Sequence, residues 1–274
     1  MIKRILIAIA VAVPFMASAQ DPKLDELDKS SFGVWTSLTA EKQLNKRWAV
    51  DIDAELRTID GVGDIGRWSV GAGAEYKINK WLKASAGYSL LNDYNYKVTY
   101  HTLGSRTGRP NKFAKFWGVR HRANLSLTGS LKVGHFGFSL RERYQFTHRP
   151  EKTIDQRYDF DKEAFDGKPK TYEEKNTHVL RSRLKVTYNI PKFPLTPFVS
   201  AEMYSCNIEK EIKEGAEIKT TTEFGIAKMR YQGGVEWKIN KKHGIEMYYQ
   251  YQDENDEDEQ FGKHVLGVGY KFKF

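Results

Sequence analysis

Three segments of the chain carry two arginines separated by a single residue. Carboxylates recur at the same alternating positions elsewhere in the sequence. Guanidinium groups hold carboxylates and phosphates through paired hydrogen bonds, so this set predicts either a lattice of ion pairs or a site for a small anionic solute. The residues concerned are Arg120 and Arg122, Arg141 and Arg143, Arg181 and Arg183, with Asp51, Asp53, Glu55, Glu75, Glu202, Glu236 and Glu246.

The segments that carry these charges alternate strictly between polar and apolar residues from Phe32 onward. In one such segment Trp48, Val50 and Ile52 alternate with Asp51 and Asp53. Successive side chains of a β-strand point to opposite faces, so this period predicts strands with one apolar face and one charged face. Buried charges persist only when they are paired, and we therefore expect the charged residues to meet inside the fold.

Short and long connections alternate between the predicted strands. The longest predicted loops cover residues 92–114 and 147–176. Outer-membrane barrels combine short periplasmic turns with longer extracellular loops. We therefore predict an all-β fold, a single antiparallel transmembrane β-barrel of about 10–12 strands. Eleven segments are recognisable, but single-chain bacterial barrels have an even number of strands, so twelve is our preferred count, with residues 21–31 as the missing strand or a segment in the lumen.

The two ends of the chain predict export to the outer membrane of a Gram-negative bacterium. Lys3 and Arg4 precede an apolar run, and Ala17-Ser18-Ala19 follows it, as in a cleavable signal peptide. We expect residues 1–19 to be that signal, 20–31 an N-terminal segment and 32–274 the barrel. The final strand ends on Phe274, which resembles the aromatic signal that barrels present to their assembly machinery. The expected surroundings are outer-membrane lipid and lipopolysaccharide.

Other chemistry has little support in the sequence. The seven histidines lack zinc-type spacing, and the acidic run of residues 253–259 lacks the spacing of a calcium-binding EF-hand. A single cysteine, Cys206, excludes an internal disulfide. Removing Lys3 and Arg4 from the net charge of +9 leaves +7, too mild and too evenly spread to indicate a nucleic-acid partner. We predict no metal site and no cofactor, and we can nominate no catalytic trio.

A family resemblance follows from four short motifs. They are the signal, the opening strand Phe32-Gly33-Val34-Trp35-Thr36, the turn Asn45-Lys46-Arg47-Trp48 and the ending His264 to Phe274. Together they resemble the Domain-of-Unknown-Function 2490 family over nearly all of the mature chain. The resemblance implies an outer-membrane protein of Gram-negative bacteria without an established activity, so no family site residues can be carried over.

Three functional hypotheses follow. The first is an outer-membrane barrel with a structural or adhesive role, or a narrow, porin-like pore biased toward anions. The second is an outer-membrane enzyme acting on lipid or peptide, which would assemble its site from distant strands. The third is a soluble periplasmic barrel that binds a ligand, and it requires the apolar side chains to face inward.

Overall fold

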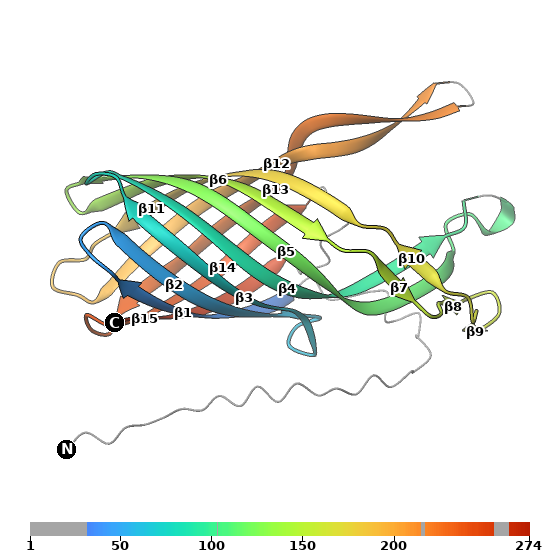
Figure 1. The fold of residues 1–274 in the computed structure, drawn as a ribbon, viewed down its shortest axis with the longest axis horizontal. Helices are drawn as coiled ribbons and strands as arrows, with labels where there is room; N and C mark the ends of the chain where they lie inside the picture. Colours follow the sequence, from blue (N-terminus) through green and yellow to red (C-terminus); the bar gives the residue numbers. More distant parts are fainter. Residues whose placement is uncertain (1–31, 103, 215–216, 255–262) are drawn as a thin grey trace, which may run out of the picture.

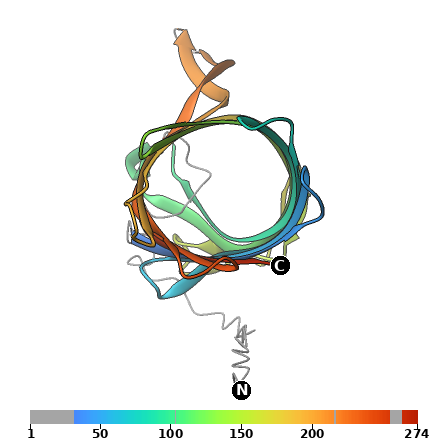
Figure 2. The same ribbon diagram turned by 90° about the vertical axis from the view of Figure 1, so that its left-hand side faces the viewer.

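The computed structural model is a closed β-barrel with strand extensions at one end (Figure 1). It describes residues 32–102, 104–214, 217–254 and 263–274. The expected signal peptide, the N-terminal segment and most of the acidic run lie outside these residues. Viewed along its axis, the barrel is a continuous ring (Figure 2).

Eleven strands form the wall of the barrel. In chain order they are β1 (Phe32–Gln43), β2 (Trp48–Ile59), β3 (Asp64–Lys77), β4 (Leu82–Tyr100), β5 (Pro110–Val133), β6 (Phe136–Arg149), β11 (Lys175–Tyr188), β12 (Leu195–Glu214), β13 (Glu217–Lys238), β14 (His243–Glu254) and β15 (His264–Lys273). Each pairs antiparallel with the next wall strand along the chain, apart from the closing pair. The β-prone residues along these strands, such as Val, Ile, Tyr and Thr, suit a pleated wall with two distinct faces.

The expected count of twelve strands is wrong for the part of the chain that the structure describes. β1 pairs in parallel with β15, from Phe32 opposite His264 to Glu41 opposite Lys273. This parallel seam closes a ring of eleven strands without a twelfth. An odd number of strands necessarily makes the first and last strands run in the same direction, and the direct pairing satisfies both edges.

The two ends of the barrel differ. Tight turns and the C-terminus gather at one end, which we call the turn end, and the longer connections lie at the other, the loop end (Figure 1). Much of residues 92–114, predicted as a loop, is strand instead, because β4 and β5 continue their ladder from Asn92 opposite Val119 to Tyr100 opposite Pro110. β12 and β13 likewise continue as a hairpin that projects from the loop end (Figure 1).

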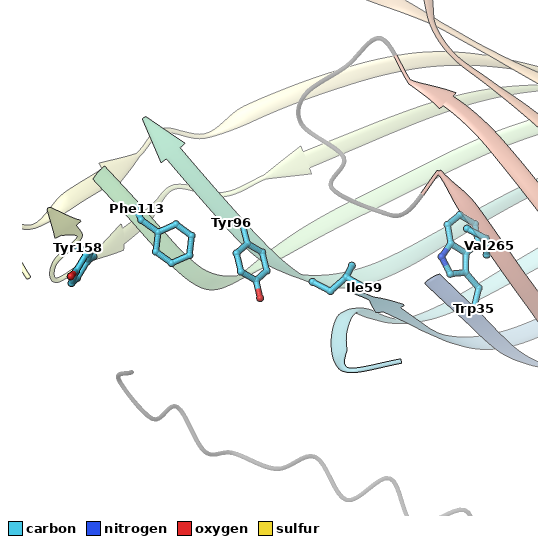
Figure 3. Close-up of a cluster of buried hydrophobic side chains, with 6 residues drawn as sticks. All are labelled: Trp35, Ile59, Tyr96, Phe113, Tyr158 and Val265. Atoms are coloured by element: carbon cyan, nitrogen blue, oxygen red, sulfur yellow. The ribbon is translucent and has the colours of Figure 1, made fainter. Parts of the chain in front are cut away.

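The segment between β6 and β11 adds four short strands at the loop end. They are β7 (Lys152–Ile154), β8 (Tyr158–Asp159), β9 (Ala164–Phe165) and β10 (Lys170–Tyr172). β8 pairs with β5, so the sheet extends beyond the barrel. Tyr96, Phe113 and Tyr158 are buried along this extension, while Trp35, Ile59 and Val265 lie at the barrel rim (Figure 3). Within the described residues, no helix is long and apolar enough to cross a membrane.

Candidate functional site: the charged lumen

The apolar side chains face outward and the polar ones face the lumen. Ile52 and Leu125 on the outer face are 64% and 61% exposed, whereas Gln250 and Gln252 on the inner face are fully buried. This arrangement contradicts the premise of the soluble ligand-binding barrel, which needs an apolar interior. A continuous apolar exterior is instead what a lipid environment favours.

Four arginines form the densest group of charge on the inner wall. Arg141 and Arg143 belong to β6, and Arg181 and Arg183 to β11. The ladder places Arg143 opposite Arg181 and Arg141 opposite Arg183. Because residues i and i+2 of a strand share a face, all four guanidinium groups point into the lumen. We call this group the Arg cluster.

Glu202 is the one carboxylate that forms ion pairs with the Arg cluster among the described residues. It lies on β12, directly opposite Arg183 in the ladder. Its Oε1 accepts a hydrogen bond from Arg141 at 2.6 Å, and its Oε2 accepts one from Arg181 at 3.0 Å. Two of the four arginines therefore pair with this one carboxylate.

Arg143 and Arg183 form no ion pair with a carboxylate of the described chain. Arg143 donates to the hydroxyl of Ser126 at 2.8 Å, a neutral partner. The buried Nε atoms of Arg141 and Arg183 have no acceptor in this part of the protein. Guanidinium donors of this kind suit an anionic partner.

Further polar contacts fix the geometry around Glu202. Tyr204 donates to Glu202 at 3.1 Å and accepts a hydrogen bond from Arg230, and Arg230 also donates to Gln252 at 3.0 Å. Arg181 donates to Gln145 at 2.9 Å. The guanidinium groups of Arg181 and Arg230 also lie over the Tyr204 ring, with their central carbons 4.4 and 4.7 Å from its centroid. These contacts hold the arginines in place, as a preformed binding site requires.

Acidic residues line another part of the lumen. Asp51 and Asp53 point inward from β2, and neither forms an ion pair among the described residues. Asp53 lies over Gly71 of β3, where a Cβ atom would come within 2.6 Å of the carboxylate oxygen. A larger residue at position 71 would have to displace the Asp53 carboxylate. The lumen therefore has an acidic wall at β2 and a basic wall at β6 and β11. The charge of Arg143 acts on both aspartates.

The other predicted charges form separate local pairs. Arg120 contacts Asp93 at 2.8 Å, and Arg122 donates to Thr147 at 3.3 Å. Glu55 pairs with Arg57 at 2.7 Å, and Glu75 pairs with Lys83 at 2.7 Å. Lys185 joins Glu236 at 2.6 Å and Glu246 at 3.1 Å. The thirteen predicted residues thus all line the inner wall, but in several clusters rather than in one lattice.

Several lumen residues escaped the sequence analysis. Arg67 is almost fully buried and binds Asp93 through two hydrogen bonds, while Lys185 and Arg230 complete other clusters. Trp35 also points inward, with the Arg57 guanidinium 3.7 Å from its ring centroid. The inward position of Trp35 could have been predicted from the alternation along the strand. Trp35 belongs to the same alternating series as Ser37, Thr39 and Glu41, and Leu38 belongs to the other.

Exposure changes along the lumen. At the turn end, the side chains of Glu75 and Lys83 are 40% and 46% exposed. Toward the loop end, Arg67, Gln250 and Gln252 are buried. The inner wall is therefore open to solvent at the turn end and tightly packed toward the loop end. No group of three or more metal-binding side chains occurs within the described ranges.

Residues 32–262 match the family described as "Protein of unknown function (DUF2490)". The chain belongs to the DUF2490 family. No curated protein matches the sequence.

Solved structures share the fold of this DUF2490 protein. The β-domain of the Bordetella autotransporter BrkA has 12% identity and a TM-score of 0.50, with 83% of each chain covered. The translocator domain of the autotransporter NalP from Neisseria meningitidis has 12% identity and a TM-score of 0.49, covering 85% of this chain and 77% of that one. The NanC porin has 14% identity and a TM-score of 0.45, covering 88% and 97%. At 12% identity the likeness to the β-domain of BrkA concerns the fold alone, which is an outer-membrane-type β-barrel.

Proposed function

We propose that this DUF2490 protein is an outer-membrane channel whose lumen binds and admits small anionic solutes. The observation that carries the proposal is the Arg cluster, in which two of four neighbouring guanidinium groups pair with Glu202, while Arg143 and Arg183 form no ion pair with a carboxylate of the described residues. A solute with a carboxylate or phosphate group would supply the missing negative charge. It would also supply acceptors for the buried Nε donors of Arg141 and Arg183.

The location in the outer membrane is supported by the apolar exterior and by the type of fold. The polar lumen gives a solute a path that avoids hydrocarbon, and rings of charged side chains select ions by sign in membrane pores. The solvent-exposed turn end gives access to the Arg cluster. The acidic wall at Asp51 and Asp53 would orient a solute that carries both charge signs, because the two walls attract its opposite ends.

Conductance in planar lipid bilayers tests this proposal. The full-length mature protein is expected to form channels that favour chloride over potassium in a salt gradient. The double variant Arg143→Gln/Arg183→Gln should bring the anion-to-cation permeability ratio close to one. Lys170→Gln, which removes the same type of charge from an exposed strand outside the barrel, should leave the ratio unchanged.

Two outcomes contradict the proposal in different ways. Channels with unchanged selectivity in the double variant would refute the role of the Arg cluster. Absence of channels above the bilayer baseline would refute the pore and favour the second candidate, a closed barrel with a structural or adhesive role. The burial of Arg67, Gln250 and Gln252 near the loop end is the observation that supports this second candidate.

A further inference from the structure

Two arginines and two aspartates face the lumen without ion pairs. Among the described residues, Arg143 and Arg183 form none with a carboxylate, and Asp51 and Asp53 form none with a cation. All four are partly exposed rather than buried, so solvent reaches this part of the lumen. Charges packed inside a protein persist by pairing. Four unpaired charges of opposite sign therefore indicate space between the acidic wall and the basic wall.

The ladder places these charges at one level of the barrel. β2 and β11 lie across the ring from each other, with four wall strands between them on one side and five on the other. Cross-strand partners traced from Arg183 through β6, β5, β4 and β3 reach Lys77 at the turn end. Partners traced through β12, β13 and β14 reach Gln252 toward the loop end. Because tilted strands make such rows oblique, the level of Arg183 on β2 lies between the two ends, near Asp53.

Each charged group lies along its own wall instead of reaching across the lumen. The Asp53 carboxylate lies over Gly71 of β3, where a Cβ atom would come within 2.6 Å of its oxygen. The Asp51 carboxylate lies over Gly73 in the same way, at 3.0 Å. Arg143 donates to a neutral hydroxyl on the neighbouring strand β5. The gap between the walls is therefore free of these side chains, yet the charge of Arg143 acts across it on both aspartates.

We propose that this gap is a binding site for a small solute that carries both an acid group and a protonated amine. The carboxylate or phosphate of the solute would bind Arg143 and Arg183, and its ammonium group would bind Asp51 and Asp53. The inference rests on the proposed function and specifies the solute of that lumen, which is an amine-bearing acid rather than a simple anion.

Both ends of such a solute satisfy groups that have no ionic partner in the described chain. The acid end accepts hydrogen bonds from guanidinium groups, including the buried Nε of Arg183. An ammonium group has three donors, which suits the two neighbouring carboxylates of Asp51 and Asp53. The acidic wall repels a simple anion and the basic wall repels a simple cation. Complementary charge at both ends therefore discriminates in favour of the solute that carries both signs.

Block of the chloride conductance in planar lipid bilayers tests the class of solute. Three amino acids of increasing length, β-alanine, γ-aminobutyrate and ε-aminocaproate, are each compared with the acid that lacks the amine, namely propionate, butyrate and caproate. We expect at least one amino acid to block at a concentration about tenfold or more below that of its matched acid. The advantage should peak at one length, because the two walls are a fixed distance apart.

A double variant removes the acidic end of the site. Asp51→Asn/Asp53→Asn should fold, because neither carboxylate takes part in an ion pair among the described residues. Each amino acid should then block no better than its matched acid, and the preference for chloride should rise because negative charge is lost. The control is Glu142→Gln. Glu142 lies between Arg141 and Arg143 on β6, so it faces outward, where it accepts a hydrogen bond from Ser182 at 2.6 Å. Its replacement should leave the advantage of the amino acids intact.

Failure of this inference is distinguishable from failure of the channel. A channel that prefers chloride but responds equally to amino acids and plain acids at every length would overturn the inference and leave the channel intact. If no channels form, calorimetry in detergent makes the same comparison of the three pairs. Tighter binding of an amino acid there would support the site in a closed barrel, and equal affinities in all three pairs would overturn it.

Discussion

At the residue scale, Glu202 contributes more to the lumen than its single charge indicates. It is buried and pairs with Arg141 and Arg181, and Tyr204 donates a further hydrogen bond. Replacing it would leave the Arg cluster without any bonded carboxylate in the described chain. The cost of removing one partner of a buried pair comes chiefly from the charge left behind.

We predict that Glu202→Gln lowers the free energy of unfolding by about 3–5 kcal/mol. Urea unfolding in lipid, followed by the heat-dependent mobility shift of the folded barrel, measures this loss. Added phosphate should recover part of it, because the anion would replace the missing carboxylate. Glu75→Gln is the control: its pair with Lys83 is exposed and should contribute about 1 kcal/mol or less. Equal losses in both variants would contradict the special role of Glu202.

Asp166 gives the loop-end extension a dependence on pH. Its side chain is 1% exposed and accepts hydrogen bonds from Lys112 Nζ at 2.8 Å and from the backbone amides of Arg157 and Lys168. The hydrogen bond from Lys112 is the main reason that the pKa of this carboxyl is well below its usual range. Protonation of Asp166 would weaken these hydrogen bonds, so we expect it to favour local unfolding of the loop-end extension.

The sign of this coupling follows from the lowered pKa. Stability from Asp166 is fully present above the unfolded pKa of about 3.9 and is lost as the pH falls below it toward the folded pKa. Hydrogen exchange at the Arg157 and Lys168 amides should show strong protection at pH 6 and weaker protection at pH 3. Asp166→Asn should remove the difference. The exposed Asp155→Asn variant should keep it, and a pH response equal in both variants would contradict the assignment.

Sequence patterns could predict which face these residues occupy, but not which partners they bind. The Arg-X-Arg spacing was sufficient to place the Arg cluster on one face, since strand periodicity alone determines the face. The pairing of Arg143 with Ser126, and of Arg141 with Glu202, depends on register and on contacts across neighbouring strands, which no single segment encodes. Glu142 interrupts an apolar series from Phe136 to Phe146, so its outward position could have been read from the same pattern.

At the scale of the strand, glycines determine how side chains lie on the inner wall. Tyr248 of β14 lies flat over Gly267 of β15, and a Cβ atom at Gly267 would overlap the tyrosine ring. The absence of a side chain on β15 therefore lets the ring rest against the wall. Gly233 of β13 differs, because a Cβ atom there would meet nothing within 4 Å.

These two glycines form a matched test of the packing. Gly267→Ala should push the Tyr248 ring off the wall and lower the free energy of unfolding by about 1–3 kcal/mol. Gly233→Ala should change it by less than about 1 kcal/mol, since added atoms meet open space. Urea unfolding of both variants in the same lipid measures the difference. A neutral Gly267→Ala variant would show that the ring moves freely.

Strand extensions at the loop end illustrate what local patterns miss. Residues 92–114 carry charges and tyrosines that indicate a polar loop, yet β4 and β5 continue through most of them. Tyr96 and Phe113 pack with Tyr158, which arrives from the segment after β6. That packing partner is distant in sequence, so local polarity could not reveal that these residues are part of a sheet.

At the scale of the whole molecule, alternation correctly predicted an all-β barrel, whereas the rule of even strand number misled. The eleven segments visible in the sequence are the eleven strands of the wall. Their closure depends on an edge-to-edge match between β1 and β15, which are more than two hundred residues apart. The parallel pairing leaves no requirement for a twelfth strand in the described wall.

That parallel seam separates the two ends of the folded domain. Phe32 begins β1 at the loop end and Phe274 lies at the turn end, whereas an even-stranded barrel returns its chain to the side where it started. In a membrane, a protease site introduced just before Phe32 and one added after Phe274 would face different compartments. A protease supplied to intact cells should therefore cut one and spare the other, which makes this barrel a natural carrier for reporters on both sides of one membrane.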